Sequence, residues 1–187
     1  MNPKVLITGP PRCGKSTLIN SIITSLQKDY IIYGFLTPEI RKGGKRIGFQ
    51  LEDIQTGKKI LLAQIGNFNT KYKLGRYSIF LNEFDRFLID TLESDINKIS
   101  NTKHQKSIII IDEIGKMELS SKLFQEIIKN FFQKQFPIIA TIGEKLNHPL
   151  KKFILRLPDI LLFNLNRNNQ HLIIQKIKKK LEIECKS

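Results

Sequence analysis

Gly9-Pro10-Pro11-Arg12-Cys13-Gly14-Lys15-Ser16-Thr17 is the stretch that decides the fold. It has the spacing G-x4-G-K-[ST], and it stands between an apolar run at 5–7 and a helical pattern of Leu and Ile at 18–26. Strand, loop and helix in that order predict a phosphate-binding loop. Glycines let the backbone wrap closely around phosphates, and N–H groups at a helix start face the anion. The stretch therefore predicts a nucleoside-triphosphate site.

The polar residues of this loop have distinct expected roles. Lys15 is expected to reach the β- and γ-phosphates and to stabilise charge during phosphoryl transfer. The Ser16 hydroxyl is expected to ligate Mg2+. Arg12 lies inside the loop and therefore close to the ligand. The predicted nucleotide-binding residues of the loop are Gly9, Pro10, Pro11, Arg12, Cys13, Gly14, Lys15, Ser16 and Thr17.

A second motif, made of two acidic residues, follows the run Ile108-Ile109-Ile110-Ile111. Four β-branched residues without alternation are typical of a strand buried on both faces of a parallel sheet. Asp112 ends that run and fits a Walker B carboxylate that would hold Mg2+ at the edge where the phosphate loop lies. Glu113 is predicted to be the general base, because a carboxylate beside the metal can activate water in line with the γ-phosphate.

The rest of the chain alternates between strand and helix patterns. Residues 34–65 show a period of two with turn signals, which predicts an antiparallel meander, and 66–77 is interpreted as a loop. A helix capped by Asn82 and extending to Ile99, then a polar break at 101–105, is expected. Ser120 or Ser121 is expected to cap the next helix. We predict one three-layer α/β domain over 1–187, with further strands at 137–141 and 159–165 and a last helix at 168–184.

Composition restricts the partners of this chain. Its net charge is +14, but 24 of the 31 basic residues are Lys, scattered apart from a cluster at 176–180. A solvated basic surface is therefore favoured, and nucleic-acid binding stays possible but not favoured. The sequence has neither an apolar run near the ~20 residues that span a bilayer nor a signal peptide, so we expect a cytoplasmic monomer without a membrane partner. Cys13 and Cys185 make no disulfide framework.

Extra positive charge on the transferring phosphoryl group is expected from arginine. The chain has seven arginines. Arg41 and Arg76 flank the predicted meander and could fold over the site. Arg156 and Arg167 lie around the last predicted strand, where a nucleotide sensor or a base contact is often placed. Lys116 is a weaker candidate for the same task.

At Asp112-Glu113-Ile114-Gly115-Lys116-Met117-Glu118-Leu119 the chain resembles the thermophilic nucleoside-triphosphatase family. The resemblance covers nearly the whole chain, from the phosphate loop through 34–49 and 74–77 to Asn166-Arg167. Arg12-Cys13 stands where the family more often has Gly and a small apolar residue, and Asn164 stands where Thr is expected. The resemblance implies a RecA-like fold, base contacts at Asn166 and Arg167, and a second nucleotide-binding segment comprising Ile109, Ile110, Ile111, Asp112, Glu113, Ile114, Gly115 and Lys116.

The function implied is slow, Mg2+-dependent hydrolysis of several nucleoside 5′-triphosphates to diphosphate and phosphate. Two alternatives stay open at this point. The same phosphate loop serves nucleotide and small-molecule kinases, and the meander could be an acceptor lid. An RNA-associated ATPase would explain the basic charge and the lysine cluster.

Overall fold

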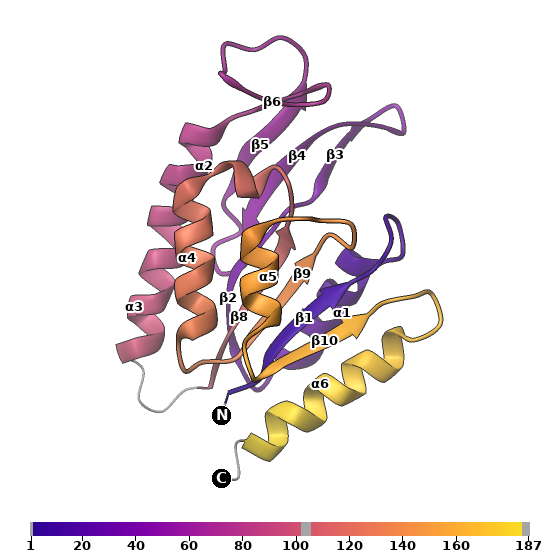
Figure 1. Cartoon of the computed structure of the whole chain (residues 1–187), viewed down its shortest axis with the longest axis vertical. Helices are drawn as coiled ribbons and strands as arrows, with labels where there is room; N and C mark the ends of the chain where they lie inside the picture. Colours follow the sequence, from indigo (N-terminus) through magenta and orange to yellow (C-terminus); the bar gives the residue numbers. More distant parts are fainter. Residues whose placement is uncertain (1, 102–105, 185–187) are drawn as a thin grey trace.

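A mixed β-sheet is the centre of the molecule (Figure 1). The structure, a computed structural model, describes residues 2–101 and 106–184. One half of the sheet is parallel and consists of β1 (Lys4–Thr8), β2 (Ile31–Leu36), β8 (Ser107–Ile114), β9 (Ile138–Ile142) and β10 (Ile160–Asn164). The other half is antiparallel and consists of β3 (Glu39–Lys42), β4 (Lys45–Asp53), β5 (Lys59–Ile65), β6 (Tyr72–Leu74) and β7 (Tyr77–Ile79).

The strand order is β10-β1-β9-β8-β2-β4-β5-β7-β6, with β3 paired to β4. β2 joins the two halves, because it pairs in parallel with β8 and antiparallel with β4. The predicted α/β sheet with an antiparallel meander is therefore confirmed. The strands that carry the phosphate loop and Asp112, β1 and β8, both have neighbours on each side.

The isoleucine run of β8 shows why the sheet lies in the middle layer. Ile109 and Ile111 pack on one face and Ile108 and Ile110 on the other, and all four are fully buried. A strand alternates its side chains between faces, so an uninterrupted apolar run requires cover on both sides. The sequence expectation for this strand is confirmed.

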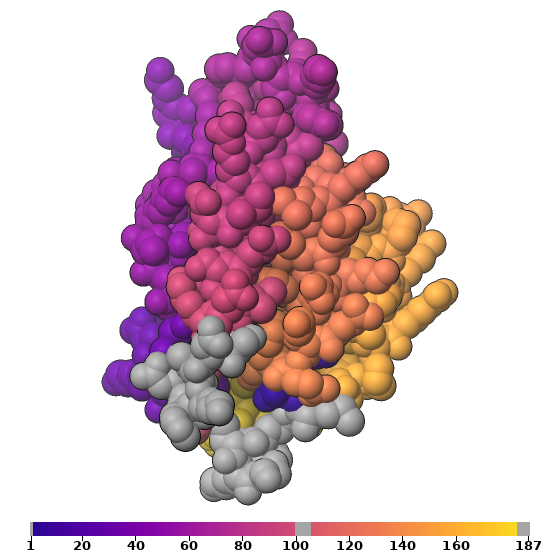
Figure 2. All heavy atoms as spheres, turned by 90° about the vertical axis from the view of Figure 1, so that its left-hand side faces the viewer, coloured from indigo at the N-terminus to yellow at the C-terminus, as the bar shows by residue number. Residues whose placement is uncertain are grey.

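Helices supply that cover on the two faces. α1 (Lys15–Leu26) and α6 (Gln170–Glu184) share one apolar core with the sheet. The opposite core holds residues of α2 (Leu81–Leu88), α3 (Ser94–Asn101), α4 (Lys122–Gln133) and α5 (Pro149–Leu155). Figure 2 shows α3 beside α4 on that side of the molecule. The predicted three layers are therefore present.

Residues 66–77, interpreted from the sequence as a loop, contain β6 and the first residue of β7, so that prediction was wrong. The two strands form a hairpin in which Leu74 pairs with Tyr77. Gly75, in the turn, has a φ of 56°, which a glycine adopts without strain. Strands of three residues are too short to show a period of two, which explains why the pattern was missed.

The helix after the meander also differs from the prediction. It begins at Leu81 with Phe80 at the N-cap and without a side-chain cap, so Asn82 is not the cap. A π-helical turn, η1 (Ile89–Glu93), separates α2 from α3. Ser121 does cap α4, because its hydroxyl accepts a hydrogen bond from the Phe124 N–H at 3.0 Å. α5 was not predicted. Residues 102–105 of the predicted polar break, and Cys185, lie outside the described residues.

Candidate active site

The phosphate loop connects β1 to α1, as its sequence predicts. At two positions of the loop, neighbouring atoms lie too close for any residue with a Cβ. A Cβ added to Gly9 would lie 2.6 Å from the Leu165 carbonyl oxygen, and one added to Gly14 would lie 2.7 Å from Gln170 Nε2. Gly14 also has a φ of 97°. The segment after β10 therefore packs directly against the loop, and side chains at these two positions would separate them.

The remaining loop residues divide between solvent and core. Pro10, Pro11 and Arg12 are exposed. Cys13 is buried in the core that α1 and α6 share, so its side chain fills the loop from beneath. Arg12 has a φ of 64°, the left-handed region that favours glycine. The left-handed conformation costs a non-glycine residue about 1–2 kcal/mol of conformational energy, so we ask below what the Arg12 side chain contacts.

Lys15 lies at the start of α1, and its Nζ donates a hydrogen bond to the Gly9 carbonyl oxygen at 3.3 Å. The ammonium group is therefore held over the loop. Ser16 and Thr17 follow in the first turn of the helix and are exposed. The arrangement places one cation and two hydroxyls at a helix N-terminus, where an anion is favoured.

Asp112 lies at the end of β8 and is only 3% exposed. Its Oδ1 accepts a hydrogen bond from the Thr141 hydroxyl at 2.5 Å. Burial raises the pKa of Asp112 above its ordinary value, while hydrogen bonds from Thr141 and Ser16 and the charge of Lys15 act in the opposite direction. The structure therefore brings together Asp112, Ser16 and Lys15, the residues predicted from two distant parts of the sequence.

Glu113 is half-buried next to Asp112. Burial raises the pKa of Glu113, Lys15 lowers it, and the neighbouring Asp112 raises it further. Its Oε1 lies 3.4 Å and 3.8 Å from Cβ positions built on Gly115 and Gly143. Two glycines thus border the Glu113 carboxylate, and the pairing of β8 with β9 shifts register between Ile111 and Ile114.

The other residues of the 109–116 segment do not all reach the loop with their side chains. Ile109, Ile110, Ile111 and Ile114 are fully buried in the two cores. They support the strand from which Asp112 and Glu113 project. Gly115 is buried and Lys116 is exposed immediately after it.

Two residues near the site were not singled out as functional from the sequence. The first is Thr37, which directly follows β2, the parallel neighbour of β8. Its hydroxyl is buried and has no hydrogen-bond partner among the described residues. Leu36 pairs with Asp112, so Thr37 is the next residue beyond the level of Asp112. A single threonine carries no local sequence signal for such a position.

The second is Glu118, in the short 3-10 helix η2 (Glu118–Ser120). It is 4% exposed, and a Cβ added to Gly115 would lie 2.6 Å from its Oε2. Burial raises the pKa of Glu118 to about 8, and the nearby Glu113 and Asp112 act in the same direction. The backbone N–H groups of Glu118 and Gly115 oppose this rise. Burial therefore favours the protonated form of Glu118 in the folded protein.

This protonation makes stability depend on pH. The pKa of Glu118 is about 8 when folded against an ordinary 4.5, so the unfolded chain releases its proton first as pH rises. Stability therefore falls between about pH 4.5 and 8. Glu118→Gln removes this dependence. Between pH 5 and pH 9, we expect the free energy of unfolding of the variant to rise relative to that of the wild type by on the order of 4 kcal/mol, or about 10 °C in Tm.

Thermal unfolding of both proteins between pH 5 and pH 9, with a chelator and without nucleotide, measures this gain. Glu126→Gln, an exposed position on α4, is the matched control and should follow the wild type at every pH. Equal pH slopes for Glu118→Gln and the wild type would contradict the assignment.

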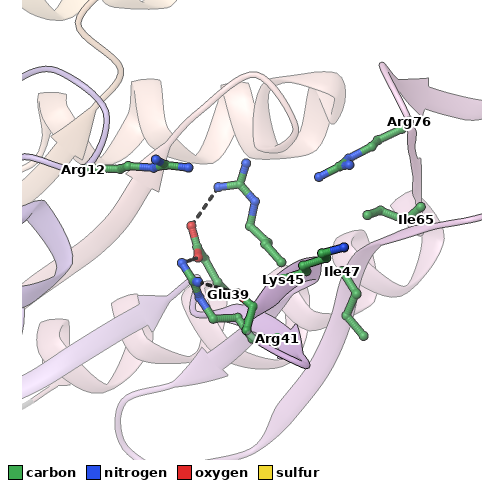
Figure 3. A pocket seen from close by; sticks show the side chains of 9 residues that line it. Arg12, Glu39, Arg41, Lys45, Ile47, Ile65 and Arg76 are labelled. Atoms are coloured by element: carbon green, nitrogen blue, oxygen red, sulfur yellow. Dashed lines mark hydrogen bonds and ion pairs between the residues drawn. The ribbon is translucent and has the colours of Figure 1, made fainter.

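The predicted charge-stabilising arginines do not all lie together. Arg41 and Arg76 line one pocket with Arg12 of the phosphate loop (Figure 3). Arg156 follows α5 and precedes β10, so it lies at the edge where the parallel strands begin, opposite the phosphate loop. Asn166 and Arg167 come directly after Leu165, which contacts Gly9. The structure therefore groups Arg41 and Arg76 with Arg12 and leaves Arg156 apart.

Comparison with known proteins agrees with this geometry. The model of a family described as NTPase matches residues 4–178 of the chain. The chain belongs to this NTPase family. It is 36% identical to nucleoside-triphosphatase THEP1 of Aquifex aeolicus over 96% of the chain and 99% of that protein. It is 35% identical to THEP1 of Thermotoga maritima over 93% and 92%, respectively.

Solved structures of this NTPase family share the fold. The crystal structure of THEP1 from Aquifex aeolicus has a TM-score of 0.83 at 34% identity, covering 96% of this chain and 99% of that one. The solution structure of a human cancer-related nucleoside triphosphatase has a TM-score of 0.77 at 30% identity, covering 95% and 96%. The family resemblance inferred from the sequence is therefore confirmed.

Among the residues that the structure describes, no helix combines the length and apolar character that crossing a membrane requires. No group of three or more His, Cys, Asp or Glu in the same ranges could hold a metal ion.

Proposed function

We propose that this protein hydrolyses nucleoside 5′-triphosphates to diphosphate and phosphate, with Mg2+, slowly and with little preference for the base. The observation that carries the proposal is the meeting of Asp112 and Glu113, at the end of β8, with Lys15 and Ser16 of the phosphate loop. Membership of the NTPase family supports nucleoside-triphosphate hydrolysis in general.

The residues present fit a magnesium ion. Asp112 is a buried carboxyl group whose partners are two hydroxyls, and desolvation disfavours its charged form. A divalent cation beside it would restore that form, and the Ser16 hydroxyl is in place to share the ion. Bound with the phosphates, Mg2+ would neutralise charge on the β- and γ-phosphate oxygens.

The chain's own residues then supply binding, charge and proton transfer. Backbone N–H groups of the loop and the N-terminus of α1 bind the phosphates, and Lys15 faces the transferring group. Glu113 accepts a proton from the water that attacks the γ-phosphorus. The new bond joins the water oxygen to that phosphorus, and the bond to the bridging oxygen of the β-phosphate breaks. The diphosphate is the leaving group.

The segment beside the loop supports tolerance of different bases. Two of its asparagine side chains accept hydrogen bonds from backbone N–H groups of the same segment. Asn166 Oδ1 accepts from the Asn168 N–H and Asn169 Oδ1 accepts from the Asn166 N–H, both at 2.9 Å. Side chains engaged in this way discriminate poorly between base edges, because discrimination requires groups that are left unpaired by the wrong base. Arg167 can contact a base without reading its edge.

Phosphate release from ATP, GTP, CTP and UTP tests the proposal. We expect kcat values within about tenfold of one another and below roughly 1 s⁻¹, against a typical enzyme value of about 10 s⁻¹. A chelator should abolish all four activities, and added RNA should leave them unchanged. A preference above a hundredfold for one base would contradict base tolerance. Activity that persists with the chelator would contradict the metal requirement.

A further inference from the structure

A pocket of about 430 Å³ lies between the phosphate loop and the antiparallel meander. Figure 3 shows Arg12 and Arg76 entering it from opposite sides, with Glu39 and Arg41 between them on β3. The hydrolysis proposed above assigns no role to this pocket. Its charged lining residues are Arg12, Glu39, Arg41, Lys45, Arg46 and Arg76.

The charge of this lining is strongly positive. Five cations face one carboxylate, a formal charge of +4. The side chains of Arg12 and Lys45 form neither an ion pair nor a hydrogen bond with any residue within 2–101 and 106–184. Uncompensated cations that converge on one cavity repel each other, and an anionic ligand would relieve that repulsion.

Glu39 holds two of the arginines in fixed positions. Its carboxylate pairs with Arg41 Nη2 at 2.6 Å and with Arg46 Nη1 at 2.7 Å. Arg46 Nε donates to the Tyr77 hydroxyl at 3.1 Å, and its guanidinium lies 4.9 Å from the centre of the Phe49 ring. Burial alone would raise the pKa of Glu39, but these arginines hold it below its ordinary value. Glu39 therefore orients two guanidinium groups, and the lining keeps a formal charge of +4 with Glu39 included.

Arg12 adds an independent observation. Its φ of 64° is strained for any residue with a Cβ, so glycine would be the favoured residue there. The side chain at this strained position nevertheless lines the pocket. Strain of this kind is often kept where a side chain serves a ligand.

The strand order places the pocket relative to the triphosphate. The segment after β10 packs against one side of the phosphate loop, while β8 and β2 lie on the other side of β1. A triphosphate bound along the loop, with its base near Asn166 and Arg167, would extend toward Asp112 and Glu113. The meander follows β2 and lies beyond them. The pocket would then adjoin the terminal phosphate, on the side opposite the base.

We propose that this pocket binds a second nucleotide, a nucleoside monophosphate, beside the terminal phosphate of the bound triphosphate. The placement relative to the triphosphate rests on the proposed function, whereas the charge and the shape of the pocket do not. Arginine forks match a phosphate group in geometry, and guanidinium planes stack on planar rings. Ile47 and Ile65 add an apolar wall that inorganic phosphate would not need. The volume lies within the range of about 300–1,000 Å³ of small-molecule pockets.

Calorimetric titration of the full chain, saturated with Mg2+ and a non-hydrolysable ATP analogue, tests this site. The probes are AMP, GMP, CMP and UMP, with ribose 5-phosphate and inorganic phosphate as comparisons. We expect a nucleoside monophosphate to bind once per chain without displacing the analogue, and at least tenfold more tightly than inorganic phosphate or ribose 5-phosphate. Lys45→Gln should weaken this binding by at least about tenfold.

Lys179→Gln, which removes one exposed charge from α6, is the matched control and should bind the probe as the wild type does. Retained binding of the ATP analogue by Lys45→Gln shows that the variant is folded. Four results would each overturn the proposal. The monophosphate could displace the analogue, or no monophosphate could bind. Inorganic phosphate or ribose 5-phosphate could bind equally well, or Lys45→Gln could bind the monophosphate as the wild type does. The titration measures binding only and does not depend on hydrolysis. If the protein binds the monophosphate here but releases no phosphate in the separate hydrolysis assay, only the proposed function is contradicted.

Discussion

Replacing Lys15 with Ala is expected to lower kcat for phosphate release by about a hundred- to a thousandfold, and to weaken triphosphate binding as well. Lys15 Nζ lies 3.3 Å from the Gly9 carbonyl oxygen and thus over the loop that would surround the phosphates. Its charge also acts on both carboxylates at the end of β8. Losing one such preorganised donor at a site of developing charge has an effect of this size. Phosphate release and nucleotide titration measure the two losses.

Lys28→Ala is the matched control for this substitution. Lys28 is exposed and follows the C-terminal end of α1, so the variant also removes one lysine charge but does not touch the loop. It should retain the wild-type kcat. If Lys15→Ala kept its kcat within about threefold of the wild type, Lys15 would have no part in the reaction, and the triphosphate would have to be bound elsewhere.

The phosphate loop and β8 were predictable because each signal is local. The spacing of Gly9, Gly14 and Lys15 determines what the backbone there can do, and four successive isoleucines require a strand covered on both faces. The carboxyl ends of parallel strands share one edge of the sheet, so Asp112 was expected near the loop, and the structure places it there.

Local signals failed where packing decides the structure. Asn82 is a good capping residue, yet α2 begins at Leu81, which is buried together with Phe84. Burial of the apolar face contributes more to a short helix than one cap does. The hairpin of β6 and β7 was missed for a related reason, since its strands are stabilised by pairing with β5 and not by a pattern of their own.

The charged surroundings of the site depend on the order of the strands, which the sequence does not specify locally. Arg41 and Arg76 were expected to fold over the site, and both line the pocket that Arg12 also borders. Lys45 and Arg46 of the same pocket were not singled out, because their importance arises only when β3 and β4 come to face the loop. Glu118 and Thr37 were missed for the same kind of reason, since only the folded chain reveals that the Glu118 side chain and the Thr37 hydroxyl are buried.

Replacing Glu113 with Gln is expected to lower phosphate release by about a hundred- to ten-thousandfold while triphosphate binding changes by less than about threefold. Gln has almost the same shape, so it fits the space bordered by Gly115 and Gly143, but its amide cannot accept the proton of the attacking water. Loop, lysine and metal ligands stay intact, so the ground state is bound as before. Single-turnover phosphate release, measured alongside nucleotide titration, separates the two quantities.

Glu144→Gln gives the matched control, because Glu144 is exposed and directly follows Gly143, at the same end of the sheet. It should release phosphate at the wild-type rate. Full activity in Glu113→Gln would show that another group, or the phosphate itself, takes the proton. Loss of binding together with activity would instead make Glu113 a structural partner of Lys15. Only slow release with retained binding supports a general base, because that outcome requires an interaction made in the transition state and absent from the ground state.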